Sequence, residues 1–139
     1  MPVVRSSVVH PEASALVGIP FREGGRDFRA AVGGTDCGGI CWEFCRRAGI
    51  DARDPWAIIA EQWREPDRSI GVEAGLVVGG WERCDDVERL VGDIGESASG
   101  DHVAVYVGGG YALHARRGST SSLLPISRAP LARWWRWSR

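Results

Sequence analysis

The chain of 139 residues contains no lysine, and no acidic residue follows Asp101. All 17 basic residues are arginines; 11 of them lie in residues 1–101 with all 18 acidic residues, so this segment has a formal charge of 11 − 18 = −7. Residues 102–139 carry the other six arginines and no acid, which gives +6. A net charge of −1 divided in this way argues against a protein with a basic surface throughout. We therefore expect no nucleic-acid partner.

Long hydrophobic runs are also absent. No stretch approaches the ~18 consecutive apolar residues expected of a membrane-spanning helix. Arg5, His10 and Glu12 interrupt the apolar residues near the start, and no small-residue cleavage site follows a hydrophobic run, so this segment does not resemble a secretory signal. We expect a protein without a transmembrane segment that is made in the cytoplasm. A hydrophobic content of 44% suits a single domain over residues 1–139.

The four cysteines include no Cys-x-x-Cys pair, which weakens the hypothesis of a redox thiol protein. Cys37, Cys41 and Cys45 fall in one predicted helix, where Cys37 and Cys45, eight positions apart, lie about 12 Å apart along the axis. That distance is too long for a disulfide, and sulfurs spread over two turns cannot share one tetrahedral zinc ion. We expect no disulfide, metal or cofactor, and we expect Cys41, Cys45 and Cys84 to be small buried side chains or inert thiols.

The clearest predicted element is a helix over residues 36–50. Asp36 is a favoured N-cap, Ile40 and Phe44 lie one turn apart, and Gly49 follows a pair of arginines. Weaker signals predict a short helix over 11–17, an irregular loop over 21–35, a helix over 54–63 capped by an aspartate, a short strand over 75–80 and a helical turn over 85–90. Four tryptophans are expected in the core or along a groove: Trp42, Trp56, Trp63 and Trp81.

A β-hairpin is predicted over residues 102–115, where the alternating segment HVAVYV is followed by three glycines and YALHA. If the glycines form the loop, the core-facing pairs are Val107 with Tyr111, Val105 with Leu113 and Val103 with Ala115. The opposite face then places His102 and His114 as diagonal neighbours, roughly 7–8 Å apart at the backbone. Two histidines on a face of small residues suggest a prepared site.

Cys37 would begin the predicted helix 36–50, where the positive end of the helix dipole favours a thiolate. Gly38 and Gly39 would leave backbone N–H groups free to approach a developing oxyanion. A neutral imidazole could accept the thiol proton while a second polar group fixes its tautomer. We hypothesise that Cys37 is a nucleophile, His102 its base and His114 the orienting group; the alternative is ordinary packing of a cysteine and two satisfied histidines.

Six motifs occur in a fixed order: Gly18-Ile-Pro-Phe21, Gly24-Gly25, Asp36-Cys37-Gly-Gly-Ile40, Val91-Gly-Asp93, His102-Val-Ala-Val-Tyr-Val-Gly108 and Leu113-His114-Ala115. This order resembles the NlpC/P-sixty group of papain-like cell-wall cysteine peptidases, whose pattern is roughly G-T-P-Y, G-G, D-C-S-G-L, P-G-D, H-V-G-I-Y-x-G and I-H-A. The resemblance spans about residues 12–116, which is most of the chain.

The resemblance implies an α+β, papain-like NlpC-type fold in which the nucleophile helix packs on an antiparallel β-sheet. It implies the same catalytic roles for Cys37, His102 and His114, and it adds Asp36 as a residue that helps to bind substrate. Members of the family are cysteine endopeptidases or amidases that cleave peptidoglycan stem peptides, often between D-glutamate and a diamino acid. We therefore expect a peptidoglycan hydrolase.

Three positions depart from the family pattern. Phe21 stands where a tyrosine usually supplies a hydroxyl, Gly38 replaces the serine after the nucleophile, and Val91 replaces a proline. Phe21 and Gly38 are substrate-binding positions in the resemblance, so two polar contacts to the stem peptide would be absent. An alternative function is therefore a catalytically idle structural or adaptor subunit that retains the pocket.

Residues 131–139 (LARWWRWSR) form a Trp- and Arg-rich C-terminal tail. It could be a terminal strand that packs its indoles on the core, or a contact with a partner protein or an anionic envelope. Short family members with such a C-terminus resemble components of phage tails and gene-transfer agents. That resemblance predicts a virion-tail protein that acts in the periplasm or cell wall and binds tail-tip proteins; the alternative is a contact-delivered antibacterial amidase effector.

Overall fold

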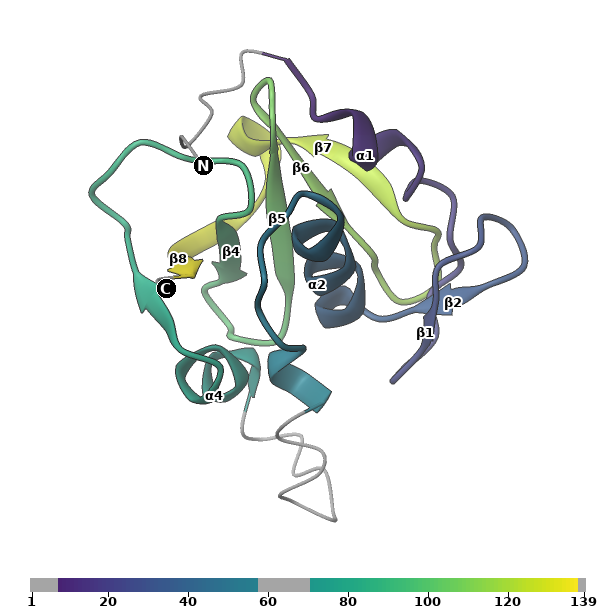
Figure 1. Cartoon of the computed structure of the whole chain (residues 1–139), viewed down its shortest axis with the longest axis horizontal. Helices are drawn as coiled ribbons and strands as arrows, with labels where there is room; N and C mark the ends of the chain where they lie inside the picture. The colour runs from purple at the N-terminus through teal and green to yellow at the C-terminus, as the bar shows by residue number, and fades with distance from the viewer. Residues whose placement is uncertain (1–7, 58–70, 138–139) are drawn as a thin grey trace.

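The computed structural model describes residues 8–57 and 71–137. Its central element is a six-stranded antiparallel sheet (Figure 1). The strand order is β3-β8-β4-β5-β6-β7, so the last strand of the chain lies inside the sheet. The strands are β3 (Trp81–Arg83), β4 (Ile94–Ser97), β5 (Val103–Gly108), β6 (Tyr111–His114), β7 (Ser122–Pro125) and β8 (Leu131–Trp137), with a 3₁₀ turn η1 (Ile126–Arg128) between the last two.

The helix α2 (Cys37–Arg47) packs against β5 and β6 and lies in front of the sheet in Figure 1. The side chain of Asp36 caps it by accepting a hydrogen bond from the Gly39 N–H at 2.7 Å. At the other end Gly49 has φ +88°, a left-handed conformation that glycine adopts without strain. Ile40 and Phe44 are fully buried between the helix and the sheet. The predicted helix is confirmed.

The β5–β6 hairpin follows the predicted register along most of its length. Val105 pairs with Leu113, and the valines of β5 are buried in the core. The end of the hairpin differs from the prediction, because Tyr111 pairs with Gly108 rather than with Val107. The register shifts there because all three glycines of the turn adopt positive φ angles, which lets the chain reverse within two residues.

Two weaker predictions in the middle of the chain are wrong. Residues 75–80, predicted as a strand, belong mainly to the helix α4 (Gly71–Val78), which packs beside β3. In this helix Leu76 is fully buried and Val77 is 58% exposed. Packing in the fold has outweighed the strand propensity of the valines. Residues 85–90, predicted as a helical turn, form a turn followed by irregular chain, and the guanidinium of Arg89 donates to the carbonyl of Val87 at 2.6 Å.

The segments before α2 and after it position the start of that helix. They include α1 (Pro11–Ser14), shorter than the predicted helix 11–17, and a small antiparallel pair, β1 (Arg26–Asp27) and β2 (Gly34–Thr35), inside the predicted loop 21–35. Residues 55–57 are helical, and the Asp54 side chain accepts hydrogen bonds from the N–H groups of Trp56 (3.1 Å) and Ala57 (3.2 Å), as its predicted capping role requires. The rest of the predicted helix 54–63 lies outside the described residues.

The C-terminal segment forms a strand of the sheet between β3 and β4. Trp135 is 3% exposed, and its indole N–H donates to Oε1 of Glu96 at 3.0 Å. Arg133 also bonds to Glu96, at 3.1 Å. Residues 131–137 therefore match the interpretation of a terminal strand that packs an indole on the core. None of the helices in the described ranges is long and apolar enough to cross a membrane.

Candidate active site

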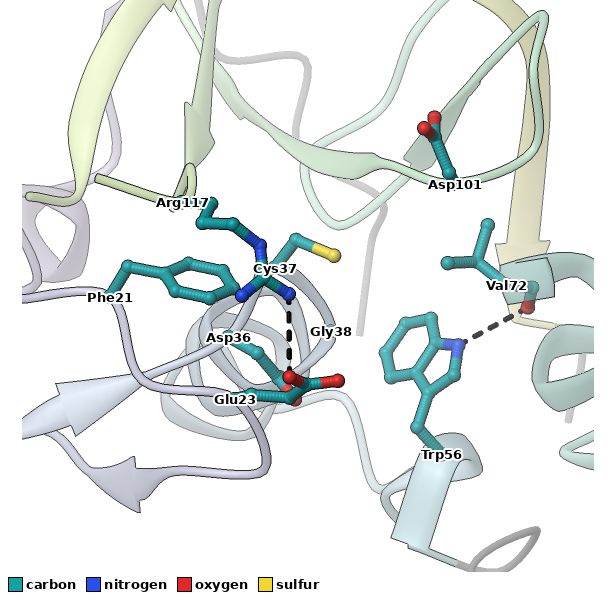
Figure 2. Close-up of a pocket in the computed structure, with 9 residues that line it drawn as sticks. All are labelled: Phe21, Glu23, Asp36, Cys37, Gly38, Trp56, Val72, Asp101 and Arg117. Carbon is teal, nitrogen blue, oxygen red and sulfur yellow. Dashed lines mark hydrogen bonds and ion pairs between the residues drawn. The ribbon is translucent and has the colours of Figure 1, made fainter. Parts of the chain in front are cut away.

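Cys37, the first residue of α2, opens onto a pocket of about 220 Å³. In Figure 2 its sulfur points into the space between two sides of this pocket, one formed by Trp56 and Val72 and the other by Phe21 and Arg117. Four lining residues were predicted as site residues: Phe21, Asp36, Cys37 and Gly38. Trp56, expected in the core or along a groove, also lines the pocket. The other lining residues were not predicted from the sequence: Glu23, Val72, Asp101 and Arg117.

The two histidines form a hydrogen-bonded pair, as the predicted hairpin implies. Nε2 of His102 lies 3.2 Å from Nδ1 of His114, and the rings meet edge to face with centroids 5.4 Å apart. Because Nε2 of His102 is engaged with His114, its Nδ1 is the nitrogen left for another partner. His102 immediately precedes β5, and His114 ends β6.

Burial keeps both imidazoles neutral at neutral pH. It lowers the pKa of His102 to about 4, with smaller contributions in the same direction from the charges of His114 and Arg116, while Asp101 opposes the shift. Burial and Arg116 also lower the pKa of His114. A neutral imidazole is the form that can accept a proton, so the environment suits a general base.

The Cys37 thiol differs from the prediction of a favoured thiolate. Burial is the largest influence and raises its pKa, while interactions with the backbone of Val103, Gly38 and Cys37 itself oppose that shift. The sulfur thus lies beside Val103, the first residue of β5. Val103 directly follows His102 in the chain. Within the described ranges no hydrogen bond joins the Cys37 sulfur to either imidazole. Cys41 and Cys45 are fully buried free thiols, as expected, and Cys84 is half-buried.

Asp36 has a clear structural role at the pocket. Its carboxylate accepts hydrogen bonds from the N–H groups of Gly39 (2.7 Å) and Gly24 (3.0 Å) and from Arg26 (2.9 Å). These bonds fix the start of α2 and the preceding loop. The expectation that the Gly39 N–H is free for an oxyanion is wrong, because Asp36 occupies it; the N–H groups of Cys37 and Gly38 are the candidates that this end of α2 retains.

Arg26 is a positioning residue that the sequence did not reveal. Its guanidinium donates to Asp36 at 2.9 Å and to Asp54 at 2.7 Å, so one side chain joins the N-caps of two helices. Its charge is stabilised by these two carboxylates, which together raise its pKa against the opposing effect of burial. Local patterns predicted both caps, but only the β1–β2 pair brings Arg26 between them.

Of the three positions that depart from the expected pattern, Phe21 and Gly38 line the pocket, on opposite sides of it, and Val91 is not among its lining residues. The Arg117 guanidinium lies 5.3 Å from the centre of the Phe21 ring and pairs with Glu23 at 3.3 Å (Figure 2). Gly38 lies against Trp56, and a Cβ atom at Gly38 would fall 2.6 Å from that indole. The Trp56 indole therefore leaves no room for a side chain at position 38.

Comparisons with known proteins agree with this geometry at the level of the fold. No family model matches the chain, and no curated protein matches it either. Among solved structures, the chain is similar to the crystal structure of the NlpC/p60 domain of the peptidoglycan hydrolase SagA, with a TM-score of 0.52 and 22% sequence identity over 88% of this chain and 91% of that one. The chain therefore has an α+β, papain-like NlpC-type fold in which α2 packs on an antiparallel sheet.

Proposed function

We propose that this protein is a cysteine peptidase that hydrolyses peptide bonds in peptidoglycan stem peptides. The observation that carries the proposal is the His102–His114 pair, held at 3.2 Å at the start of the strand whose backbone contacts the Cys37 sulfur. The likeness to a domain of a peptidoglycan hydrolase supports the choice of substrate. The open pocket around Cys37 supplies room for a peptide.

The geometry suggests how the groups would share the reaction. With His102 Nε2–H donating to His114 Nδ1, the unprotonated Nδ1 of His102 can accept the thiol proton of Cys37. The thiolate attacks the scissile carbonyl carbon, and the oxyanion accepts hydrogen bonds from backbone N–H groups at the start of α2. The imidazolium then protonates the leaving amine. Water, deprotonated by His102, attacks the thioester carbonyl carbon and the C–S bond breaks. The acyl group leaves as the carboxylate product, and the imidazolium returns a proton to the Cys37 thiolate.

Replacement of the nucleophile gives the direct test. Cys37→Ala should abolish the release of stem-peptide fragments from purified peptidoglycan while circular dichroism shows an unchanged fold. Cys84→Ala is the matched control, because Cys84 is a half-buried thiol on the loop after β3 and does not line the pocket. Undiminished release by Cys37→Ala would overturn the proposal.

A catalytically idle structural or adaptor subunit is the second candidate. It is favoured by the raised pKa of Cys37 and by the absence of the tyrosine and serine hydroxyls at Phe21 and Gly38. Alkylation separates the two candidates: an idle subunit would leave Cys37 unreactive toward iodoacetamide at neutral pH and would release no fragments. Rapid alkylation together with hydrolysis would exclude it.

We further propose that a phage tail tip or gene-transfer agent delivers the enzyme to the cell wall. Since Trp135 is buried in β8, docking would use the outer parts of this strand, such as the half-buried Trp134, rather than a free tail. Immunodetection in purified particles tests the location. Absence from particles, with transfer of the active enzyme into contacting cells, would instead support a contact-delivered antibacterial amidase effector.

A further inference from the structure

Two glycines on two helices make room for the indole of Trp56. A Cβ atom at Gly38, in the first turn of α2, would lie 2.6 Å from the ring. A Cβ atom at Gly75, in the middle of α4, would lie 2.7 Å from the opposite part of the same indole. Real Cβ atoms do not approach this closely, so any side chain at either position would displace the ring. The slot between the helices is shaped around Trp56.

Hydrogen bonds fix the indole within this slot. The indole N–H donates to the carbonyl of Val72 at 3.2 Å (Figure 2). The Trp56 backbone N–H donates to Asp54 at 3.1 Å, and Asp54 is joined to the N-cap of α2 through Arg26. Contacts of both its backbone and its ring therefore fix the position of Trp56 relative to the start of α2, where Cys37 lies.

The same contacts reach the strand that follows the proposed base. The N–H of Val72 donates to the carbonyl of Gly100 at 3.0 Å, two residues before His102. The start of α4 is thereby tied to the segment that leads into β5 and, through the indole bond, to Trp56. Trp56 and Val72 thus form a pocket wall that is connected to both proposed catalytic segments. Such a wall keeps a defined distance from the reacting atoms, which recognition of a substrate requires.

The two sides of the pocket offer different chemistry. Trp56 and Val72 form the apolar part of one side, with the Asp101 carboxylate above Val72 (Figure 2). The indole N–H is already bonded, so the ring presents only its carbon face and edge. Phe21 forms the other side, beside the ion pair of Arg117 and Glu23 (Figure 2). The Cys37 sulfur lies between them. A peptide across the sulfur would place one residue against a carbon surface and the other against charges.

We propose that Trp56 is a specificity-determining residue: its indole face packs against the aliphatic part of the substrate residue on one side of the scissile bond. This inference rests on the proposed peptidase function for its substrate. Contact with the ring replaces the polar contact that a serine at position 38 would offer, because the indole occupies the space such a side chain needs. Trp56 contributes to substrate binding and takes no part in proton transfer.

Hydrolysis kinetics test the role in binding. Trp56→Ala should raise KM for a soluble stem peptide by about 10-fold or more, the effect of removing an apolar contact, with kcat changed less than about 3-fold. Trp56→Phe keeps an aromatic face and should restore most of the affinity. A fall in kcat with an unchanged KM would overturn the proposal, because it would mean that Trp56 positions catalytic groups.

Alkylation of Cys37 tests the wall without any peptidoglycan. In a Cys84→Ser background, with labelled sites identified by mass spectrometry, Trp56→Ala should increase the rate with N-phenylmaleimide relative to iodoacetamide. Gly75→Ala should change the same ratio without altering any residue that contacts the sulfur, since its new methyl group displaces the indole. Val77→Ala, 58% exposed on the same helix, is the matched control and should leave the ratio unchanged.

The two measurements fail separately. If the wild-type protein cleaves no stem peptide, the proposed function is wrong, yet the alkylation ratio still reports whether Trp56 borders the nucleophile. If Trp56→Ala and Gly75→Ala both melt cooperatively and leave the ratio at the wild-type value, the wall itself is wrong. Should Trp56→Ala fail to fold, Gly75→Ala and Trp56→Phe decide the same question.

Discussion

The two halves of the central sheet treat buried ionisable groups in opposite ways. On β4 and the loop before it, Glu96 and Asp93 have side chains 1% and 2% exposed, and each is paired with an arginine of β8, Arg133 at 3.1 Å and Arg136 at 2.7 Å. Directly before β5 and at the end of β6, His102 and His114 bond to each other, and burial disfavours their charged forms. The half with β4 and β8 contains charged side chains that are paired with opposite charges. The half with β5 and β6 contains imidazoles that burial keeps uncharged.

This difference separates structural from chemical use of the same kind of burial. A buried ion pair joins the two segments that carry it, because separating the partners would leave an uncompensated charge inside the fold. A buried neutral imidazole retains its lone pair and can accept a proton from a neighbour. These ion pairs also join the two oppositely charged parts of the sequence. The arginines of β8 belong to the basic part, and the carboxylates that they pair with belong to the acidic part.

Deletion of residues 131–139 should have the largest effect, because it removes a strand from inside the sheet and leaves Glu96 and Asp93 buried without their arginines. We expect loss of the cooperative thermal transition and of the folded circular dichroism spectrum. A truncated protein that melts cooperatively and still cleaves peptidoglycan would show that this half of the sheet is dispensable. It would also restore the hypothesis of a separate docking tail.

Glu96→Ala breaks one pair in the charged half while keeping the strand. It leaves the Arg133 guanidinium without its carboxylate partner and the buried Trp135 indole N–H without its acceptor, and we expect a loss of about 1–3 kcal/mol in the free energy of unfolding. Urea denaturation measures it. Asp27→Ala is the control, because the Asp27–Arg29 pair is exposed and should contribute little. Equal effects of the two substitutions would contradict the distinction between the buried and exposed pairs.

Substitutions in the histidine half should reduce activity more than stability. His102→Ala should lower kcat by about 10²–10⁴-fold, the usual contribution of a general base. His114→Asn, which keeps a polar side chain next to Nε2 of His102, should cost less than His114→Ala. Kinetics on a soluble stem peptide, with melting curves of the same variants, provide the measurement. A His114→Ala variant with full activity would remove His114 from the proposed triad.

The pH dependence of stability should show the smallest effect. The pKa of His102 is about 4 in the fold and about 6.5 in an unfolded chain. Between these values the unfolded state binds more protons, so the free energy of unfolding should fall as pH decreases from 6.5 toward 4. His102→Gln should reduce that slope in urea denaturation between pH 7.5 and 5. Identical slopes would mean that His102 is not held neutral by burial.

Local sequence signals predicted the parts of the molecule that depend on near neighbours. The Asp36 cap and the spacing of Ile40 and Phe44 identified α2, and strict alternation identified the β5–β6 hairpin and hence the contact between His102 and His114. These predictions succeeded because capping and side-chain alternation act within a few residues. The strand predicted over 75–80 failed because tertiary packing outweighed the strand propensity of the valines in this segment.

The pocket walls could not be predicted in the same way. Trp56, Val72 and Arg117 come from distant segments and meet at Cys37 only in the folded chain. The pKa of Cys37 is a further example: the helix start predicts a lowered value, yet burial, which the sequence does not state, raises it. Environment outweighs the dipole because desolvation penalises the charged thiolate directly.

By itself, the sequence determined the helix α2 that begins at Cys37, the hairpin that pairs the two histidines and the opposite charges of the two parts of the chain. Only the tertiary structure decided that the arginines of β8 neutralise Glu96 and Asp93 inside the sheet, that Arg26 joins two helix caps, and that Trp56 requires glycine at positions 38 and 75. The physical reason is range: caps and alternation act between neighbours along the chain, whereas burial and charge pairing depend on which distant segments meet.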